Sequence, residues 1–178
     1  MKFHQKFHHI VSAAAILLCT STASLAAPAG LLNKSIHISY GAYIPGRTAD
    51  GRINRSGRKV SLTLYVSSAG RIFFTGENRA GHFGRDFKAA PERTARGFHF
   101  AGSTLVGAHA ARFGNIAAQL KVSFDSSFQT CSANVIVGGT GGAPISWIGL
   151  DGERYTATGH PNISDVACSV QNGNAFAN

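Results

Sequence analysis

The alternation of apolar and polar residues is the sequence feature that most constrains the fold of this chain. It runs through three segments, 36–44, 60–66 and 116–124, of which the second reads VSLTLYV. Successive side chains of a β-strand point to opposite faces of a sheet, so a period of two gives a strand one buried face. A helix cannot use this period in that way. The alternation therefore predicts three long β-strands.

Shorter segments of the same character lie between and after these three. Asp151-Gly152 separates two of them and is a residue pair that favours a β-hairpin. Because turn residues separate the segments, the sequence predicts an all-β fold, a single antiparallel β-barrel or β-sandwich of about 8–9 short strands. The shorter segments are 71–75, 98–108, 131–137, 145–150, 153–158 and 165–171.

The first residues of the chain have a different character. Lys2 and Lys6 form a positive region, an apolar stretch follows at 10–18, and small residues surround the expected cleavage site after Ala26. This is the order of a secretory signal peptide. We therefore expect residues 1–26 to be removed and residues 27–178 to form one all-β domain, in the periplasm or outside the cell. No other segment approaches the roughly 20 apolar residues of a membrane-spanning helix.

Export also predicts a disulfide. Removal of the signal peptide takes away Cys19 and leaves Cys131 and Cys168. Two cysteines in an exported chain are expected to be oxidised. Each cysteine has the parity of its apolar neighbours, so the disulfide should face the core and tie the sixth predicted strand to the last.

The positive charge is concentrated in one third of the chain. The full sequence has 17 Lys and Arg against 8 Asp and Glu, a net charge of +9. Residues 47–96 hold eleven of the cations and four of the acidic residues, a net charge of +7. In a simple meander the loops 45–58 and 76–97 follow the first and third strands and emerge at the same end of the domain. A patch of this sign attracts polyanions and speeds their encounter.

These basic loops predict a binding protein. We expect a non-enzymatic domain that binds an anionic partner, such as lipid head groups, an envelope polysaccharide or an acidic protein, through loops 45–58 and 76–97. No recognised nucleic-acid-binding motif is present, so we do not expect a nucleic acid as the partner. The alternative for these loops is that they only keep the surface soluble. The candidate contact residues are Arg47, Arg52, Arg55, Arg58, Arg79, Arg85 and Lys88.

Two other functions remain open. The first is a small-ligand carrier, with the ligand inside a barrel lined by residues such as Tyr40, Leu64, Phe74 and Phe100. The second is an outer-membrane barrel, because eight alternating strands of about ten residues suit a chain of this length. Several of the predicted strands are too short for the second.

No motif in the sequence fixes a catalytic chemistry. The histidines that follow the signal peptide are scattered, without H-x-H or H-E-x-x-H spacing, and G-x-S-x-G is absent. An enzyme would need a cleft in which His37 or His99 meets a carboxylate. We therefore expect no catalytic site, no cofactor and no metal ion.

Two short segments carry a resemblance to a known group of proteins. They read LYVSSAGRIF at 64–73 and FDSSFQTC at 124–131. Both resemble signatures of small exported bacterial proteins of unknown function. The resemblance implies a bacterial exported protein and carries over no catalytic or binding residue.

Overall fold

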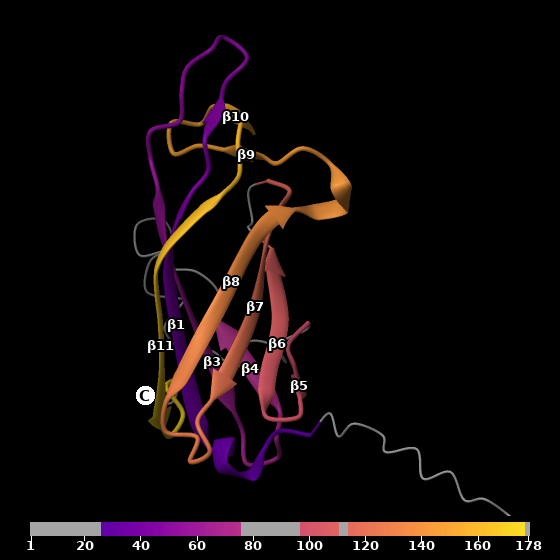
Figure 1. The fold of residues 1–178 in the computed structure, drawn as a ribbon, viewed down its shortest axis with the longest axis vertical. Coiled ribbons are helices and arrows are strands. Elements are labelled where there is room, and N and C mark those ends of the chain that lie inside the picture. Colours follow the sequence, from indigo (N-terminus) through magenta and orange to yellow (C-terminus); the bar gives the residue numbers. More distant parts are fainter. Residues whose placement is uncertain (1–25, 76–96, 111–113, 177–178) are drawn as a thin grey trace, which may run out of the picture.

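The fold is given by a computed structural model that describes residues 26–75, 97–110 and 114–176 (Figure 1). Apart from two short 3₁₀ helices, Ala29–Leu31 and Thr140–Gly142, every regular element in these residues is a β-strand. The prediction of an all-β fold is confirmed. Within the same residues, no helix is long and apolar enough to cross a membrane. The strands are β1 (Lys34–Tyr43), β2 (Gly46–Arg47), β3 (Arg58–Val66), β4 (Ile72–Thr75), β5 (His99–Ala101), β6 (Thr104–Ala110), β7 (Ile116–Phe124), β8 (Cys131–Gly139), β9 (Ser146–Ile148), β10 (Arg154–Ala157) and β11 (Asn162–Asn172).

These strands form three antiparallel sheets that do not close into a barrel. Sheet 1 has the strand order β11-β1-β3-β4, and sheet 2 has the order β5-β6-β7-β8. The two pack face to face as a sandwich, and a smaller cap sheet, β2-β10-β9, lies beyond one end of it (Figure 1). Of the two predicted architectures, the described strands thus form the sandwich, with eleven strands in place of eight or nine.

The main core lies between the inward faces of sheets 1 and 2. In sheet 1, Ile36 of β1 lies opposite Leu64 of β3, and Ile38 lies opposite Leu62. All four have the parity that the alternation assigns to the buried face, and each is at most 1% exposed. Burying one such aliphatic side chain stabilises the fold by about 1.5–3 kcal/mol. Sheet 2 contributes Phe100, Leu105, Ala118, Leu120, Val122 and Val135 to the same core.

Segment 98–108 forms a hairpin, and our prediction of a single strand there is wrong. β5 and β6 are antiparallel, with Phe100 opposite Leu105 and a turn at 102–103 between the strands. The buried residues change parity within the segment, from even at Phe98 and Phe100 to odd at Leu105. A strand with one buried face cannot change parity without an interruption, because a shift of one residue turns every side chain to the other face.

The cap sheet has a small core of its own. Ile44, Trp147 and Tyr155 are buried in it, and the rings of Trp147 and Tyr155 stack with their centroids 5.6 Å apart. The predicted hairpin at Asp151-Gly152 joins β9 to β10, whose residues Trp147 and Tyr155 lie opposite each other. β2 pairs with the other side of β10. The chain therefore enters the cap twice, at β2 after β1 and at β9 after β8, and leaves it into β3 and into β11.

The predicted disulfide is confirmed. It joins Cys131, at the start of β8, to Cys168 in β11, the last strand. Both residues pack against the main core, as their parity indicated. The bond links sheet 2 to sheet 1 at one side of the sandwich.

Candidate functional site: a cavity between the sandwich and its cap

A cavity of about 110 Å³ lies inside the sandwich at the end nearest the cap. It exists because two inward positions there carry small side chains. Ala42 follows Tyr40 on the buried face of β1, and Ala118 precedes Leu120 on the buried face of β7. Protein interiors are otherwise closely packed. The other apolar residues of the lining are Ile44, Val60, Ile116, Val137, Trp147 and Ile148.

A polar contact between the two sheets borders the cavity. The Tyr40 hydroxyl of sheet 1 lies 3.1 Å from His109 Nε2 of sheet 2. Tyr40 is 2% exposed, so its hydroxyl is removed from bulk water and its hydrogen bonding is met within the protein. Both residues line the cavity. The wall therefore has an oriented polar pair beside its apolar residues, in addition to Asn54, Ser56 and Arg58.

Arg58 stands at the outer end of the cavity. It is the first residue of β3, lies opposite Ala42 in the register with β1, and has the inward parity of Val60. An uninterrupted core stripe would have an apolar residue at this position. Arg58 is exposed, and no acidic group among the described residues lies within ion-pairing distance of its guanidinium. The guanidinium therefore offers its N–H donors at the mouth of an apolar cavity.

A second cavity of about 160 Å³ adjoins the first on the cap side. Arg58 and Trp147 line both, and Asp151 and Tyr155 line the second alone. Asn54 fixes the loop that separates β2 from β3, because its amide donates to the Ile44 carbonyl at 2.8 Å. The loop thus closes one side of both cavities and is held in place by a buried side chain.

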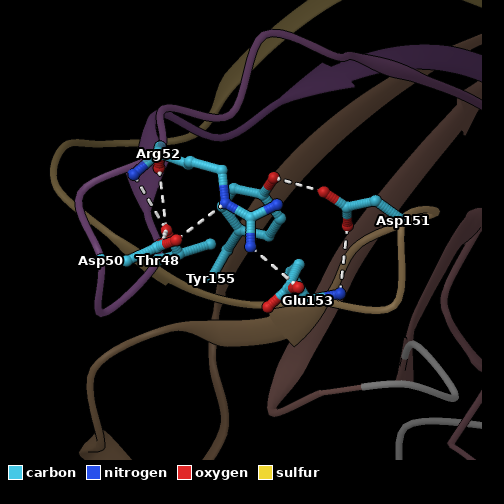
Figure 2. A network of polar contacts seen from close by, with 6 residues as sticks. All are labelled: Thr48, Asp50, Arg52, Asp151, Glu153 and Tyr155. Atoms are coloured by element: carbon cyan, nitrogen blue, oxygen red, sulfur yellow. Dashed lines mark hydrogen bonds and ion pairs between the residues drawn. The ribbon is translucent and has the colours of Figure 1, made fainter.

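Arg52, which the sequence suggested as a contact for an anionic partner, is ion-paired within the protein (Figure 2). Its guanidinium lies 3.0 Å from Asp50 Oδ2 and 2.8 Å from Glu153 Oε1. The hydrogen bond to Glu153, followed by the one to Asp50, raises the pKa of Arg52. For Asp50, a hydrogen bond from the Thr48 hydroxyl and the neighbouring Arg52 lower the pKa of the carboxyl. The four groups connect the 48–52 loop to the β9–β10 hairpin.

A second carboxylate in the same hairpin is also engaged. The Tyr155 hydroxyl donates to Asp151 Oδ2 at 2.8 Å, and the backbone N–H of Glu153 donates to Oδ1 at 3.1 Å (Figure 2). Both hydrogen bonds lower the pKa of Asp151, with Tyr155 contributing most. In return, the same bond raises the pKa of Tyr155. Asp151 and Glu153 therefore place negative charge beside the basic loop.

The other predicted contact residues are placed as follows. Arg47, Arg55 and Arg58 are exposed near the cap, with no acidic group among the described residues at ion-pairing distance. Three further residues lie outside the described residues: Arg79, Arg85 and Lys88. The structure thus separates one ion-paired arginine, Arg52, from three exposed arginines that have no described carboxylate at ion-pairing distance.

The residues suggested for a carrier are only partly in the cavity. Tyr40 lines it, whereas Leu64 and Phe100 are packed in the main core and at most 1% exposed. Phe74 packs against the ring of Phe98, with centroids 5.5 Å apart. Leu64 and Phe100 are therefore core residues, outside the cavity that Tyr40 lines.

The two histidines considered for catalysis lie on different sheets. His37 of β1 has the outward parity of sheet 1, and its Nδ1 lies 2.9 Å from the Thr63 hydroxyl. His99 of β5 is exposed and alternates with the buried Phe98 and Phe100 on sheet 2. The two rings therefore do not converge. In the described part of the chain, no three His, Cys, Asp or Glu residues are grouped so that they could hold a metal ion.

Comparisons with known proteins add no relative to this picture. No protein-family model matches the chain, and the searches of curated proteins and of solved structures give no match. The resemblance of segments 64–73 and 124–131 to small exported bacterial proteins stays a prediction. A function is therefore inferred from the side chains of the site.

Proposed function

We propose that this is an exported, non-enzymatic binding domain that holds a small amphipathic organic anion in the cavity between the sandwich and its cap. The observation that supports this most strongly is Arg58 at the mouth of the apolar cavity, in register with Ala42. The proposal takes up the carrier alternative and keeps Arg58 as a contact for negative charge. An apolar cavity with a few convergent polar groups is the usual form of a small-ligand site.

The apolar part of the ligand is limited by the size of the cavity. Apolar cavities of about 150 Å³ take up benzene in other proteins. At about 110 Å³ with an opening towards Arg58, this cavity suits one ring or a short branched chain. Such a group would lie against Ala42, Ala118 and the ring of Trp147.

The anionic part of the ligand would bind Arg58. Guanidinium groups pair with carboxylates through two parallel hydrogen bonds, which are stronger than neutral ones. No described acidic residue lies within ion-pairing distance of Arg58, in contrast to Arg52. A ligand with a carboxylate attached to a ring or a short chain would therefore fill the cavity with its apolar part and pair with Arg58 through its carboxylate.

The chain contains a single tryptophan, Trp147, and that residue lines the cavity. Its fluorescence therefore reports binding directly. Wild-type protein titrated with phenylacetate and 4-methylpentanoate should show a saturable change in emission. Phenylacetamide, which lacks the charge, should bind about tenfold more weakly or worse.

Two variants and one control test the two halves of the site. Ala118→Leu should abolish the change in Trp147 emission by filling the cavity. Arg58→Gln should weaken the binding of the two carboxylates without affecting the binding of phenylacetamide. Arg55→Gln is the matched control, since Arg55 is exposed on the same loop and does not line the cavity. The proposal fails if Ala118→Leu, shown to be folded by thermal unfolding, responds like wild type, or if wild type shows no response at millimolar ligand.

A second candidate function belongs to the surface of the basic loop. Arg47 and Arg55, together with Lys59 of β3, are exposed and have no described acidic partner. They could attract an anionic envelope component by long-range electrostatics, as the sequence predicts. Retention of the protein on a polyanion column across a salt gradient tests this.

A further inference from the structure

A trough of about 380 Å³ lies over β1, β3 and β11, near the cap. Gly41, Tyr43 and Lys59 have the outward parity of sheet 1, opposite to that of Ala42 and Val60. Most of the trough is therefore on the solvent side of the sheet, but Ala42 and Arg58, which have the inward parity, also line it at the end of β1 and β3. Its polar lining consists of Tyr43, Arg58, Lys59, Asn162, Ser164 and Asp165.

The floor of the trough is open because residue 41 is a glycine. A Cβ atom at Gly41 would lie 2.5 Å from Ser164 Oγ, which is shorter than any ordinary contact. Any larger residue would displace Ser164 and raise the floor. The glycine thus leaves the hydroxyl of Ser164 accessible beside Lys59, which lies opposite Gly41 in β3.

A β-bulge brings two consecutive side chains of β11 into the trough. The register between β1 and β11 shifts between Ser39 and Gly41, and Asp165 has a φ of 49°. Consecutive residues of a regular strand face opposite sides of the sheet, but a bulge redirects one of them. Ser164 and Asp165 therefore both line the trough, and the Ser164 hydroxyl donates to Asp165 Oδ2 at 3.0 Å.

The charges of the lining are divided between its two sides. β3 contributes two cations, Arg58 and Lys59, and β11 contributes a carboxylate, Asp165, with the amide of Asn162 and a hydroxyl. A bare polyanion would be repelled by Asp165, and a neutral sugar would leave two cations without a partner. A carboxylate accepts hydrogen bonds from hydroxyl groups, and cations pair with carboxylates.

We propose that this trough binds an acidic saccharide. Its carboxylate would pair with Lys59, and its hydroxyl groups would donate to Asp165 and exchange hydrogen bonds with Asn162 and Ser164. The ring of Tyr43 borders the site in a fixed position, because its hydroxyl donates to the Asn54 carbonyl at 3.0 Å. This site is separate from the cavity and its ligand. The proposal rests on the second candidate function, and it names an acidic polysaccharide as the anionic partner.

The test is calorimetric titration with trigalacturonate, and with maltotriose as a neutral trisaccharide. Wild type should bind trigalacturonate and bind maltotriose at least about tenfold more weakly. Lys59→Gln and Asp165→Asn should each weaken the binding of trigalacturonate by about tenfold. The first variant loses the ion pair with the sugar carboxylate, and the second loses the charged acceptor for the sugar hydroxyl groups. Lys121→Gln, an exposed lysine on the outward face of sheet 2, is the matched charge control and should bind like wild type.

Three results would overturn the proposal: no heat with trigalacturonate at millimolar concentration, equal binding of the neutral trisaccharide, or unchanged binding in both trough variants. Titration with polyphosphate, which carries negative charge but no sugar hydroxyl groups, distinguishes failure of the saccharide site from failure of the second candidate function, the attraction of polyanions by the basic surface. If the protein binds polyphosphate but not trigalacturonate, the second candidate function is supported and the saccharide site is refuted. Trp147 fluorescence with phenylacetate should be unaffected by Asp165→Asn, which keeps the cavity proposal distinguishable.

Discussion

Cys131 and Cys168 connect the two sheets of the sandwich at one side, with their Cα atoms 5.5 Å apart. β8 is an edge strand of sheet 2, and β11 is an edge strand of sheet 1. The covalent bond therefore joins two neighbouring strands that belong to different hydrogen-bonded sheets. It also fixes β11, which follows directly on the cap.

Replacing both cysteines with serine should lower the free energy of unfolding by about 4 kcal/mol in the chain-entropy account, because the bond closes a long loop in the unfolded chain. The two residues are 37 positions apart in the sequence. Urea denaturation followed by circular dichroism measures the change. Reduced wild type should unfold at the same midpoint as the double variant, and a loss below about 1 kcal/mol would contradict the entropic role.

The turn between β7 and β8 should make the fold sensitive to acid. Asp125 accepts backbone hydrogen bonds from Gln129 at 2.8 Å and Thr130 at 3.0 Å, and a further one from the Ser127 hydroxyl. These bonds, that of Ser127 first, lower the pKa of Asp125 from 3.8 to about 2. A depressed pKa means that the ionised carboxylate stabilises the folded state above the ordinary value, and that this contribution disappears as the pH falls through the folded value.

Asp125→Ala should therefore unfold at a lower temperature than wild type above pH 3.8, and the difference should shrink as the pH approaches about 2. Thermal unfolding of both proteins across this range measures the effect. Ser127→Ala should show a smaller difference with the same pH dependence. A gap between wild type and Asp125→Ala that stays constant from neutral to acid pH would show that the carboxylate's charge does not matter.

The all-β fold and its long strands could be predicted because their information is local, whereas the choice between barrel and sandwich was left open. Ile36, Ile38, Leu62 and Leu64 occupy the inward positions that the period of two assigns to them. The hairpin at 98–108 was missed although its signal was present, as a change in the parity of the apolar residues. Arg58 had a similar signal, since it continues the inward stripe of β3.

The cavity and its surroundings could not be predicted from local pattern. Ala42 and Ala118 lie in different sheets, and only their approach in space leaves a volume that Trp147 then covers. Likewise, Glu153 is remote in sequence from Arg52, yet the cap brings its carboxylate to 2.8 Å. The linear count of charge in residues 47–96 therefore overstated the positive excess of the described loop.

The two kinds of arginine in the basic loop should behave differently towards a polyanion. On a sulfated-polysaccharide column, the Arg47→Ser and Arg55→Ser variants should each lower the salt dependence of retention by roughly one unit. Arg52→Ser should lower it less, since its guanidinium already lies against Asp50 and Glu153. Equal effects of all three substitutions would indicate that only net charge matters. Elution of wild type at low salt would indicate that the loop only keeps the surface soluble and does not bind polyanions.

The close approach of Gly46 in β2 to the indole ring should control the environment of Trp147. A Cβ atom at Gly46 would overlap the indole ring and lie 2.8 Å from the Thr156 carbonyl oxygen. Gly46→Ala should therefore push Trp147 away from Tyr155, shift its emission towards that of exposed tryptophan, and abolish the response to phenylacetate. Gly138→Ala is the matched control, because a Cβ there meets no atom within 4 Å. The disulfide-linked sandwich should still unfold cooperatively in both variants, and unchanged Trp147 emission in Gly46→Ala would refute the close packing of β2 on the ring.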